Sequence, residues 1–174
     1  NSNHQIGFHV DACLGGFILP FKEKIDKKQY YFDFRNKNIT SISMDTHKYG
    51  YSPKGTSVIL YKIKELAHYQ YMVEPNWPGG IYISPNVAGS RSGLVIAGTW
   101  VSMVYNGYNG YLKKTKDILK IVKYIYNELI NIDDLRILAY PYTTVISIGS
   151  NKFNIYILGE LMSKRNWNLN MLQF

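Results

Sequence analysis

Ser41–Gly55 has the sequence Ser-Ile-Ser-Met-Asp-Thr-His-Lys-Tyr-Gly-Tyr-Ser-Pro-Lys-Gly, and the rest of the chain is best understood from it. Apolar and small polar residues alternate through Ile39–Met44, which predicts a short buried strand. Glycines and Pro53 then exclude a helix and predict a loop that carries His47 and Lys48. Reactive side chains in a loop after a strand are typical of the ligand-binding edge of an α/β sheet. The alternative is a plain connecting turn whose lysine points into water.

A second stretch, Phe8–Phe17, has the sequence Phe-His-Val-Asp-Ala-Cys-Leu-Gly-Gly-Phe and places Asp11 at the end of another short strand. The separation from Lys48 leaves room for one crossover helix, so we expect two parallel neighbouring strands and a shared edge for Asp11 and Lys48. This pair suits pyridoxal phosphate. The lysine amine forms a Schiff base with the cofactor aldehyde, and the carboxylate keeps the pyridine nitrogen protonated.

The motifs of the chain resemble the sphingosine-1-phosphate lyase family, pyridoxal-phosphate enzymes of the group II decarboxylase type. The matching stretches are His9–Ala12 with Gly15-Gly16, Asp45–Gly50 with Pro53–Gly55, Gly79–Tyr82 with Ser84-Pro85, Ala88–Arg91, and Trp167–Asn170 with Leu172–Phe174. His-Val-Asp-Ala and His-Lys alone indicate only the broader decarboxylase superfamily, whereas Tyr49–Lys54 and Ala88–Arg91 are more specific. The resemblance runs end to end, and it is to an internal piece of such an enzyme.

The resemblance implies an α/β fold: part of a pyridoxal-phosphate-dependent transferase-like (fold type I) large domain, followed by the start of a small C-terminal αβ domain. We expect residues 1–110 to be the last part of the cofactor-binding large domain and residues 111–132 to be a connecting helix. Residues 133–174 would then begin the small domain, which is truncated here.

Hydrophobic periodicity and the positions of glycine and proline predict the elements along the chain. The predicted strands are 6–10, 39–44, 56–61, 136–139 and 144–148, with another beginning near Trp167. The predicted helices are 64–71, 94–105, 111–130 and 153–164, with a break at 107–110. We expect an irregular or short helical segment at 13–21 that is broken at Pro20, a charged surface segment at 22–28, and a long ordered loop at 73–92.

The resemblance assigns cofactor-binding roles to four residues near the two strand ends. Lys48 is the expected Schiff-base lysine, and because a cationic amine does not attack an aldehyde, we expect burial or a nearby positive charge to lower the pKa of Lys48. Asp11 is expected to pair with the pyridinium nitrogen, with a helix N-cap as the alternative. Ala12 would offer apolar surface to the ring, although core packing explains it equally well. His47 matches the family position that contacts the cofactor phosphate.

Five further residues are expected to complete the site. Lys54 is a candidate for proton transfer or for binding the substrate phosphate, and an exposed turn lysine is the alternative. Gly89 and Ser90 lie in a small-residue loop suited to an anion and are expected to bind the cofactor; Arg91 ends this loop with a cation and is expected to bind substrate. In related enzymes such a loop reaches the active site of the partner subunit. Tyr82 is expected near substrate, with aromatic core packing as the alternative.

Two other titratable residues near the first strand receive structural interpretations. His9 points the same way as Asp11 on a strand but lies one layer further from its end, so we expect a supporting role. Cys13 is the single cysteine, which excludes an intrachain disulfide and any cysteine-based zinc motif, and we predict no metal site. Without an evident activating His–Asp arrangement, Cys13 is expected to be a small buried hydrophobe.

Composition limits the class of protein. Hydrophobic residues make up 46% and charged residues 18%, which is typical of globular chains rather than disordered ones. The net charge of +8 permits anionic partners, but the charge is scattered and its densest run, Lys113–Lys116, lies on a predicted helix. We therefore expect no nucleic-acid partner. No apolar run is long enough to span a membrane, and we expect this fragment itself to be soluble and cytosolic.

The implied reaction is retro-aldol cleavage of the C2–C3 bond of a phosphorylated sphingoid base, which yields a long-chain aldehyde and phosphoethanolamine. By the resemblance, the whole enzyme is a homodimer with its active site at the subunit interface. Its eukaryotic forms are anchored in the endoplasmic reticulum membrane by a segment outside this chain, with the catalytic part in the cytosol. Three alternatives stay open: an amino-acid decarboxylase on the same scaffold, an inactive fragment that lacks the upstream cofactor phosphate site, and a basic binding module without catalysis.

Overall fold

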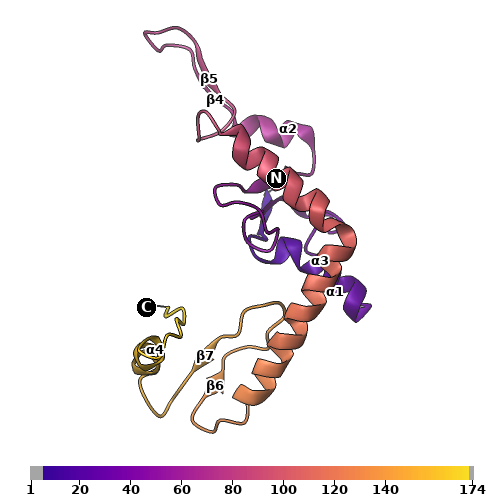
Figure 1. The fold of residues 1–174 in the computed structure, drawn as a ribbon. Coiled ribbons are helices and arrows are strands. Elements are labelled where there is room, and N and C mark those ends of the chain that lie inside the picture. The colour runs from indigo at the N-terminus through magenta and orange to yellow at the C-terminus, as the bar shows by residue number, and fades with distance from the viewer. Residues whose placement is uncertain (1–5, 173–174) are drawn as a thin grey trace, which may run out of the picture. The chain divides into compact units, whose positions relative to one another are not determined.

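The structure is a computed structural model and describes residues 6–172. The chain divides into two compact units, Asn1–Thr115 and Lys116–Phe174. All residues with a predicted site role belong to the first unit. The elements of that unit, in chain order, are β1 (Phe8–Asp11), η1 (Gly15–Phe17), α1 (Leu19–Asp26), β2 (Ile39–Met44), β3 (Val58–Tyr61), α2 (Lys64–Ala67), η2 (His68–Gln70), β4 (Met72–Glu74), β5 (Tyr82–Ser84) and the first part of α3 (Gly93–Leu129). Figure 1 labels α1, α2, β4, β5 and α3 among these elements.

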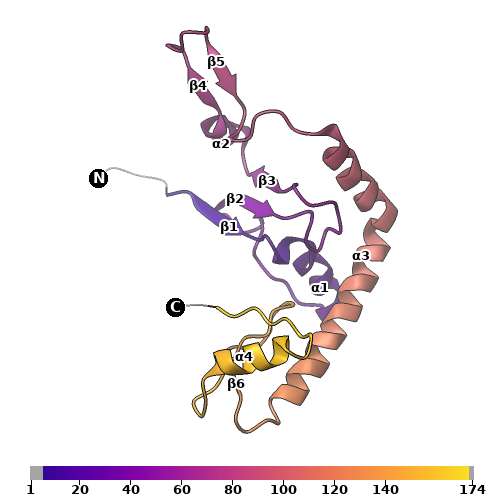
Figure 2. The ribbon, with the colours of Figure 1, turned by 60° about the vertical axis from the view of Figure 1, so that its left-hand side comes forward.

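The central feature of the first unit is a three-stranded sheet of order β1-β2-β3 (Figure 2). β1 runs parallel to β2, with Asp11 opposite Ser43, and β3 runs antiparallel to β2. The parallel pair and the bounds of β2 confirm the sequence prediction. A small core lies against this sheet, where Ile39 and Ile42 are each only 2% exposed and pack with Ala12. The two buried residues stand three positions apart, so each face of β2 has one of them, and the burial does not follow the simple alternation that the sequence pattern predicted.

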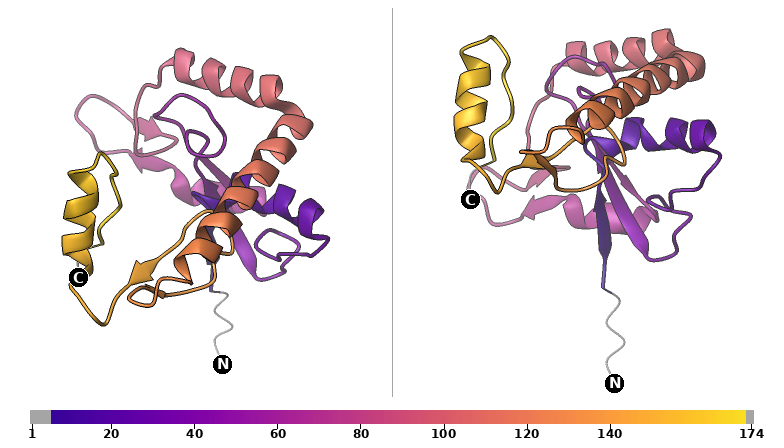
Figure 3. Two further views of the ribbon diagram at one scale, coloured as in Figure 1. Left: turned by 60° about the horizontal axis from the view of Figure 1, so that its bottom comes forward. Right: turned by 90° about the horizontal axis from the view of Figure 1, so that it is seen from below.

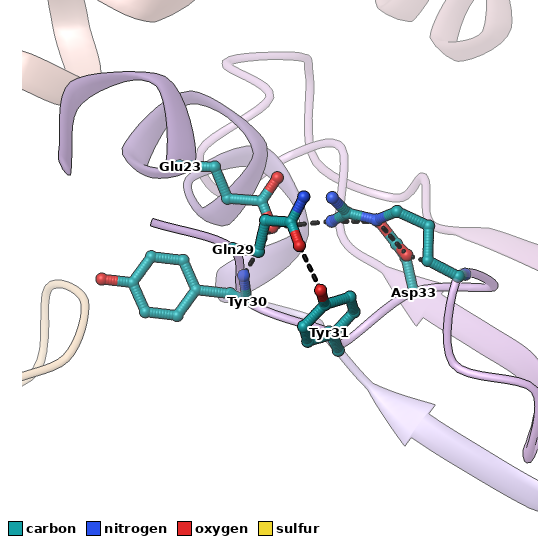
Figure 4. Close-up of polar contacts among 6 residues, drawn as sticks. Glu23, Gln29, Tyr30, Tyr31 and Asp33 are labelled. Atoms are coloured by element: carbon teal, nitrogen blue, oxygen red, sulfur yellow. Dashed lines mark hydrogen bonds and ion pairs between the residues drawn. The ribbon is translucent and has the colours of Figure 1, made fainter. Parts of the chain in front are cut away.

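The crossover from β1 to β2 contains a helix that the sequence analysis only partly predicted. Pro20 does not break this segment, because it occupies the first turn of α1, where the missing N–H is not needed. The predicted charged segment at 22–28 mostly continues that helix. An ion-pair cluster follows it: Arg35 contacts Glu23 at 2.6 Å and Asp33 at 2.7 Å. Figure 4 shows this cluster, which ties α1 to the approach to β2.

The predicted long loop at 73–92 is partly wrong, because it contains a hairpin. β4 and β5 pair antiparallel, with Val73 opposite Ile83 (Figure 1). The segment contains six prolines and glycines, but they are concentrated in the turn and after β5, and they leave two short runs of strand-forming residues free to pair. A loop without regular structure remains only between β5 and α3.

α3 has a kink at Gly107. Figure 3 shows the change of direction within this long helix. The backbone there has φ 54° and ψ −176°, which is a non-helical conformation that glycine adopts without steric cost. Two predicted helices with a glycine break between them are thus one long element with a kink. The predicted break was placed at 107–110, and only its first residue leaves the helical conformation.

The second unit contains β6 (Arg136–Ile137), β7 (Ile148–Gly149) and α4 (Ile155–Ser163) after the end of α3. The two strands pair antiparallel and are shorter than predicted. Asn154 caps α4 by accepting a hydrogen bond from the Tyr156 backbone N–H at 3.0 Å. The prediction of a strand near Trp167 is wrong. The Trp167 backbone N–H donates to the Met162 carbonyl in the turn that ends α4. The motif residues 173–174 lie outside the described residues.

Candidate functional site

Residues 45–52, which follow β2 and carry Lys48, are called the Lys48 turn. Asp11 and this turn lie at the same edge of the sheet, because β1 and β2 are parallel neighbours. Backbone hydrogen bonds continue past both strand ends: Ala12 N–H donates to the Ser43 carbonyl at 2.8 Å and Asp45 N–H donates to the Cys13 carbonyl at 3.3 Å. These bonds hold the segment after β1 beside the segment after β2. The predicted shared edge for an acid and a lysine is therefore present.

Lys48 is paired with a carboxylate in this structure. Its Nζ lies 2.7 Å from Asp45 Oδ2, and the Ser57 hydroxyl donates to the other oxygen of Asp45 at 2.7 Å. The hydrogen bond to Asp45 raises the pKa of Lys48, with a smaller contribution from the Cys13 thiol. The expectation that burial or a positive neighbour lowers this pKa is wrong for the chain as it stands. Asp45 instead stabilises the ammonium form, which cannot attack an aldehyde.

Asp11 is an exposed carboxylate whose ionised form is favoured. Its Oδ1 accepts a hydrogen bond from the Cys13 backbone N–H at 3.0 Å. This bond lowers the pKa of Asp11, assisted by the Cys13 thiol and by the positive charge of Lys48. The alternative interpretation as a helix N-cap does not hold, because Leu14 is the residue before η1 and no side chain caps that helix. Asp11 thus remains a negative charge close enough to Lys48 to interact with it.

We expect substitution of Asp45 by asparagine to make the Lys48 amine reactive at lower pH. Loss of the carboxylate removes the interaction that raises the pKa of Lys48, so the neutral amine is populated at lower pH. The measurement is the pH dependence of reductive alkylation of Lys48 by a small aldehyde, followed by peptide mass spectrometry. Asp26→Asn, which instead removes the partner of Lys22, is the matched control. An unchanged Lys48 profile in Asp45→Asn would contradict this assignment.

His47 is held by the backbone of the strand that follows. Its Nδ1 donates to the Thr56 carbonyl at 2.8 Å, which leaves Nε2 available for another group. Beneath it, the fully buried Thr46 donates its hydroxyl to the same carbonyl at 3.0 Å. His9 behaves as the supporting residue expected from its position, because its ring nitrogens lie 2.8 Å from the Ser41 hydroxyl and 3.1 Å from the Ser43 hydroxyl.

The remaining predicted residues are not joined to this cluster. Within residues 6–172, no hydrogen bond or ion pair links Lys54 or Arg91 to Asp11 or Lys48. Tyr82 packs its ring against Trp77 at a centroid distance of 6.0 Å, within the hairpin. The loop with Gly89, Ser90 and Arg91 is exposed and follows β5. The roles of these four hairpin and loop residues, and that of Lys54, stay predictions.

Several residues at the site were not assigned from the sequence. Asp45 stands three positions before Lys48, a spacing that allows contact within one turn and could have indicated the pair. Ser102 and Tyr111 contact the Lys48 turn from α3, and nothing in their local sequence signals this. Cys13 is half-buried, which is less than the small buried hydrophobe that was predicted, and its backbone N–H donates to Asp11.

Two negative findings concern the described part of the chain. No group of three or more His, Cys, Asp or Glu side chains is placed to hold a metal ion there. Among residues 6–172, no helix combines the length and the apolar composition needed to cross a bilayer.

Curated relatives match almost the whole chain. "Sphingosine-1-phosphate lyase 1" of Rattus norvegicus is 50% identical over 172 residues, which cover 98% of this chain and 30% of the relative. "Sphingosine-1-phosphate lyase" of Saccharomyces cerevisiae is 46% identical over 175 residues, which cover 98% of this chain and 29% of the relative. The chain therefore spans less than a third of the length of these relatives.

Solved structures agree with this similarity. A sphingosine-1-phosphate lyase of Burkholderia pseudomallei has a TM-score of 0.85 at 40% identity, and the match covers 97% of this chain and 38% of that chain. A glutamate decarboxylase of Lactobacillus brevis has a TM-score of 0.78 at 20% identity, covering 95% of this chain and 38% of that chain, which supports the fold alone. Both matches support the predicted α/β fold of the pyridoxal-phosphate-dependent type.

The family model described as "Pyridoxal-dependent decarboxylase conserved domain" matches residues 1–148. That range contains both strand ends and every residue with a predicted site role. The chain belongs to the pyridoxal-dependent decarboxylase family.

Proposed function

We propose that the complete protein is a pyridoxal-phosphate-dependent lyase that cleaves the C2–C3 bond of phosphorylated sphingoid bases. The products are a long-chain aldehyde and phosphoethanolamine. The observation that carries this proposal is the 50% identity to a curated sphingosine-1-phosphate lyase over 98% of the chain. This similarity supports a role in sphingolipid catabolism over amino-acid decarboxylation.

The side chains at the strand ends fit pyridoxal phosphate chemically. The cofactor has an aldehyde, a basic ring nitrogen and a phosphate, which require an amine, a carboxylate and hydrogen-bond donors. Lys48 offers the amine and Asp11 the carboxylate, from one edge of one sheet. His47 offers a ring nitrogen that its bond to Thr56 leaves available.

We assign a separate task to each of these residues. When bound, pyridoxal phosphate supplies an aldehyde for amines and a ring that withdraws electrons from the bond that breaks. Lys48 would hold the cofactor aldehyde through its amine. Asp11 keeps the ring nitrogen protonated, and its pKa, lowered by the Cys13 N–H, keeps it ionised for this task. Ala12, 5% exposed, contributes apolar surface, and His47 holds the phosphate.

The substrate phosphate needs cations that the cofactor does not use. We assign this role to Lys54, in the turn after Lys48, and to Arg91, with Tyr82 beside the substrate. Lys54 is also our candidate for moving the proton of the C3 hydroxyl. The backbone N–H groups of Gly89 and Ser90 suit an anion and are assigned to the cofactor. These roles rest on the resemblance and on the chemistry of the side chains.

A homodimer with the active site at the subunit interface belongs to the same proposal. It explains how the exposed loop around Arg91 could serve a site other than the Asp11–Lys48 cluster of its own chain. A location at the endoplasmic reticulum membrane, with the catalytic part in the cytosol, is the further expectation for a eukaryotic protein. The membrane segment would lie outside this chain.

The test of the proposal is product analysis of the complete polypeptide loaded with pyridoxal phosphate. A phosphorylated sphingoid base is expected to give a long-chain aldehyde and phosphoethanolamine in equal amounts. Release of carbon dioxide from amino acids without this cleavage would identify the protein as a decarboxylase instead. Absence of cofactor binding would leave the non-catalytic binding module as the explanation. The isolated chain, measured in parallel, tells whether the fragment is active alone.

We expect Lys54→Ala and Arg91→Ala each to lower kcat/KM for the phosphorylated sphingoid base. Charge-assisted bonds contribute about 1.5–3 kcal/mol each, which is roughly ten- to a hundredfold in affinity. Cofactor occupancy is expected to change less in Lys54→Ala, because other groups hold the cofactor. Lys113→Ala, which removes an exposed lysine on α3, is the matched control. Wild-type kinetics in both variants would reduce Lys54 and Arg91 to surface charges.

A further inference from the structure

The Lys48 turn adopts a tight backbone that the local sequence alone does not hold. Within it, Ser52 N–H donates to the Thr46 carbonyl at 3.1 Å. A Cβ on Gly50 would lie 2.4 Å from that carbonyl oxygen, so only glycine fits here. Tyr51 has φ +58°, a left-handed conformation that is unfavourable for an aromatic residue. Such a turn persists only when surrounding contacts stabilise it.

Two hydroxyl groups on α3 provide such contacts. The Tyr111 hydroxyl donates to the Gly50 carbonyl at 2.8 Å. The Ser102 hydroxyl donates to the Tyr51 carbonyl at 2.8 Å and lies 3.1 Å from the Gly50 carbonyl oxygen, which makes a shared hydrogen bond. The backbone carbonyls of Gly50 and Tyr51 therefore both accept hydrogen bonds from side chains of α3.

The surroundings of these two hydroxyls fix their direction. Tyr111 is 5% exposed, and its ring packs against Phe17 and Phe21 at centroid distances of 5.8 Å and 5.6 Å. Asn106 donates to the Ser102 backbone carbonyl at 2.7 Å and is 3.4 Å from the Ser102 hydroxyl oxygen. A donor aimed at the Ser102 oxygen leaves the hydroxyl proton free to point toward the turn.

We propose that Ser102 and Tyr111 are positioning residues that hold the Lys48 turn for cofactor attachment. They act through the Gly50 and Tyr51 carbonyls and not by touching the cofactor. This inference rests on the proposed function for Lys48. Placement of the Lys48 amine then depends on Ser102 and Tyr111, which lie far from Lys48 in the sequence.

The first arm of the test needs no cofactor. Amide hydrogen exchange over residues 45–52 is measured in the complete polypeptide, because a turn that has lost a hydrogen bond from α3 opens more often. We expect about fivefold faster exchange in Tyr111→Phe and in Ser102→Ala, and about 30-fold in the double variant, from the net contribution of each hydrogen bond. Ser102→Thr keeps the hydroxyl and is expected to restore slow exchange. Tyr108→Phe, on the same helix, is the matched control.

The second arm separates positioning from general stability. Total bound pyridoxal phosphate, the fraction covalently joined to Lys48 and Tm are measured in each variant. We expect the double variant to lower the joined fraction by about tenfold or more while total bound cofactor and Tm stay close to wild type. Parallel loss of all three would assign the two residues a purely structural role and overturn the proposal. Unchanged exchange in the double variant also overturns it. A wild-type protein that binds no cofactor refutes the proposed function. Amide hydrogen exchange alone then decides whether Ser102 and Tyr111 hold the Lys48 turn.

Discussion

Lys48→Ala is expected to abolish covalent attachment of pyridoxal phosphate and to lower turnover by about 10³-fold or more, because the amine that holds the cofactor is lost. In the structure Lys48 is the lysine beside Asp11 at the sheet edge, whereas among residues 6–172 no hydrogen bond or ion pair joins Lys54 to that cluster. The measurement is borohydride reduction of the loaded protein followed by peptide mass spectrometry, alongside single-turnover kinetics. The covalent label is expected on Lys48 in the wild type.

Lys54→Ala is the matched control for Lys48→Ala. It removes an amine from the next turn, and it is expected to keep the covalent label on Lys48. A Lys48→Ala protein that retains its visible absorption would show that another amine accepts the cofactor, with Lys54 the first to examine. Lys48→Arg keeps the ion pair with Asp45 but cannot form the bond, so it separates loss of charge from loss of the nucleophilic amine.

The sheet was predictable because its information is local. Two short strand-forming runs that end in Asp11 and in the loop with Lys48, with room for one crossover helix between them, were enough to predict parallel strands with reactive groups at one edge, and β1 and β2 pair in that way. The hairpin of β4 and β5 was not predicted, because the six prolines and glycines of residues 73–92 indicated a loop, although they occupy only its turn and its end. The break predicted at Pro20 was wrong for a related reason. Proline breaks a helix in its middle but not in its first turn, where Pro20 stands in α1.

The electrostatics of the site could not be predicted from residue types alone. The Schiff-base role predicted that burial or a nearby positive charge lowers the pKa of Lys48, but the turn brings Asp45 to 2.7 Å from the amine and raises this pKa instead. The hydrogen bonds from α3 to the Lys48 turn could not be predicted either, because Ser102 and Tyr111 lie more than 50 residues from their acceptors. Sequence patterns therefore located the reactive groups, while the protonation and support of those groups depend on contacts between distant segments.

Asp11→Asn is the second substitution with a large expected effect. The side chains have the same shape, and the asparagine oxygen can still accept the Cys13 N–H that now lies 3.0 Å from Oδ1. The change therefore removes the charge with little change in geometry. Without the carboxylate, the ring nitrogen loses the partner that keeps it protonated, and the electron-withdrawing capacity of the cofactor falls. We expect turnover to drop by about 10²–10³-fold, the size of effect that follows loss of one preorganised electrostatic partner.

Covalent attachment to Lys48 should survive in Asp11→Asn, because the aldehyde end of the cofactor is held by other groups. Mass spectrometry after borohydride reduction tests attachment, and single-turnover kinetics test the chemical step separately. Asp11→Ala, which also loses the contact with Cys13, distinguishes the charge from the turn that it stabilises. Asp26→Asn, a carboxylate of α1 paired with Lys22, is the matched control for a change of net charge. Full turnover in Asp11→Asn would remove this residue from the cofactor site, because no neutral amide can keep the ring nitrogen protonated.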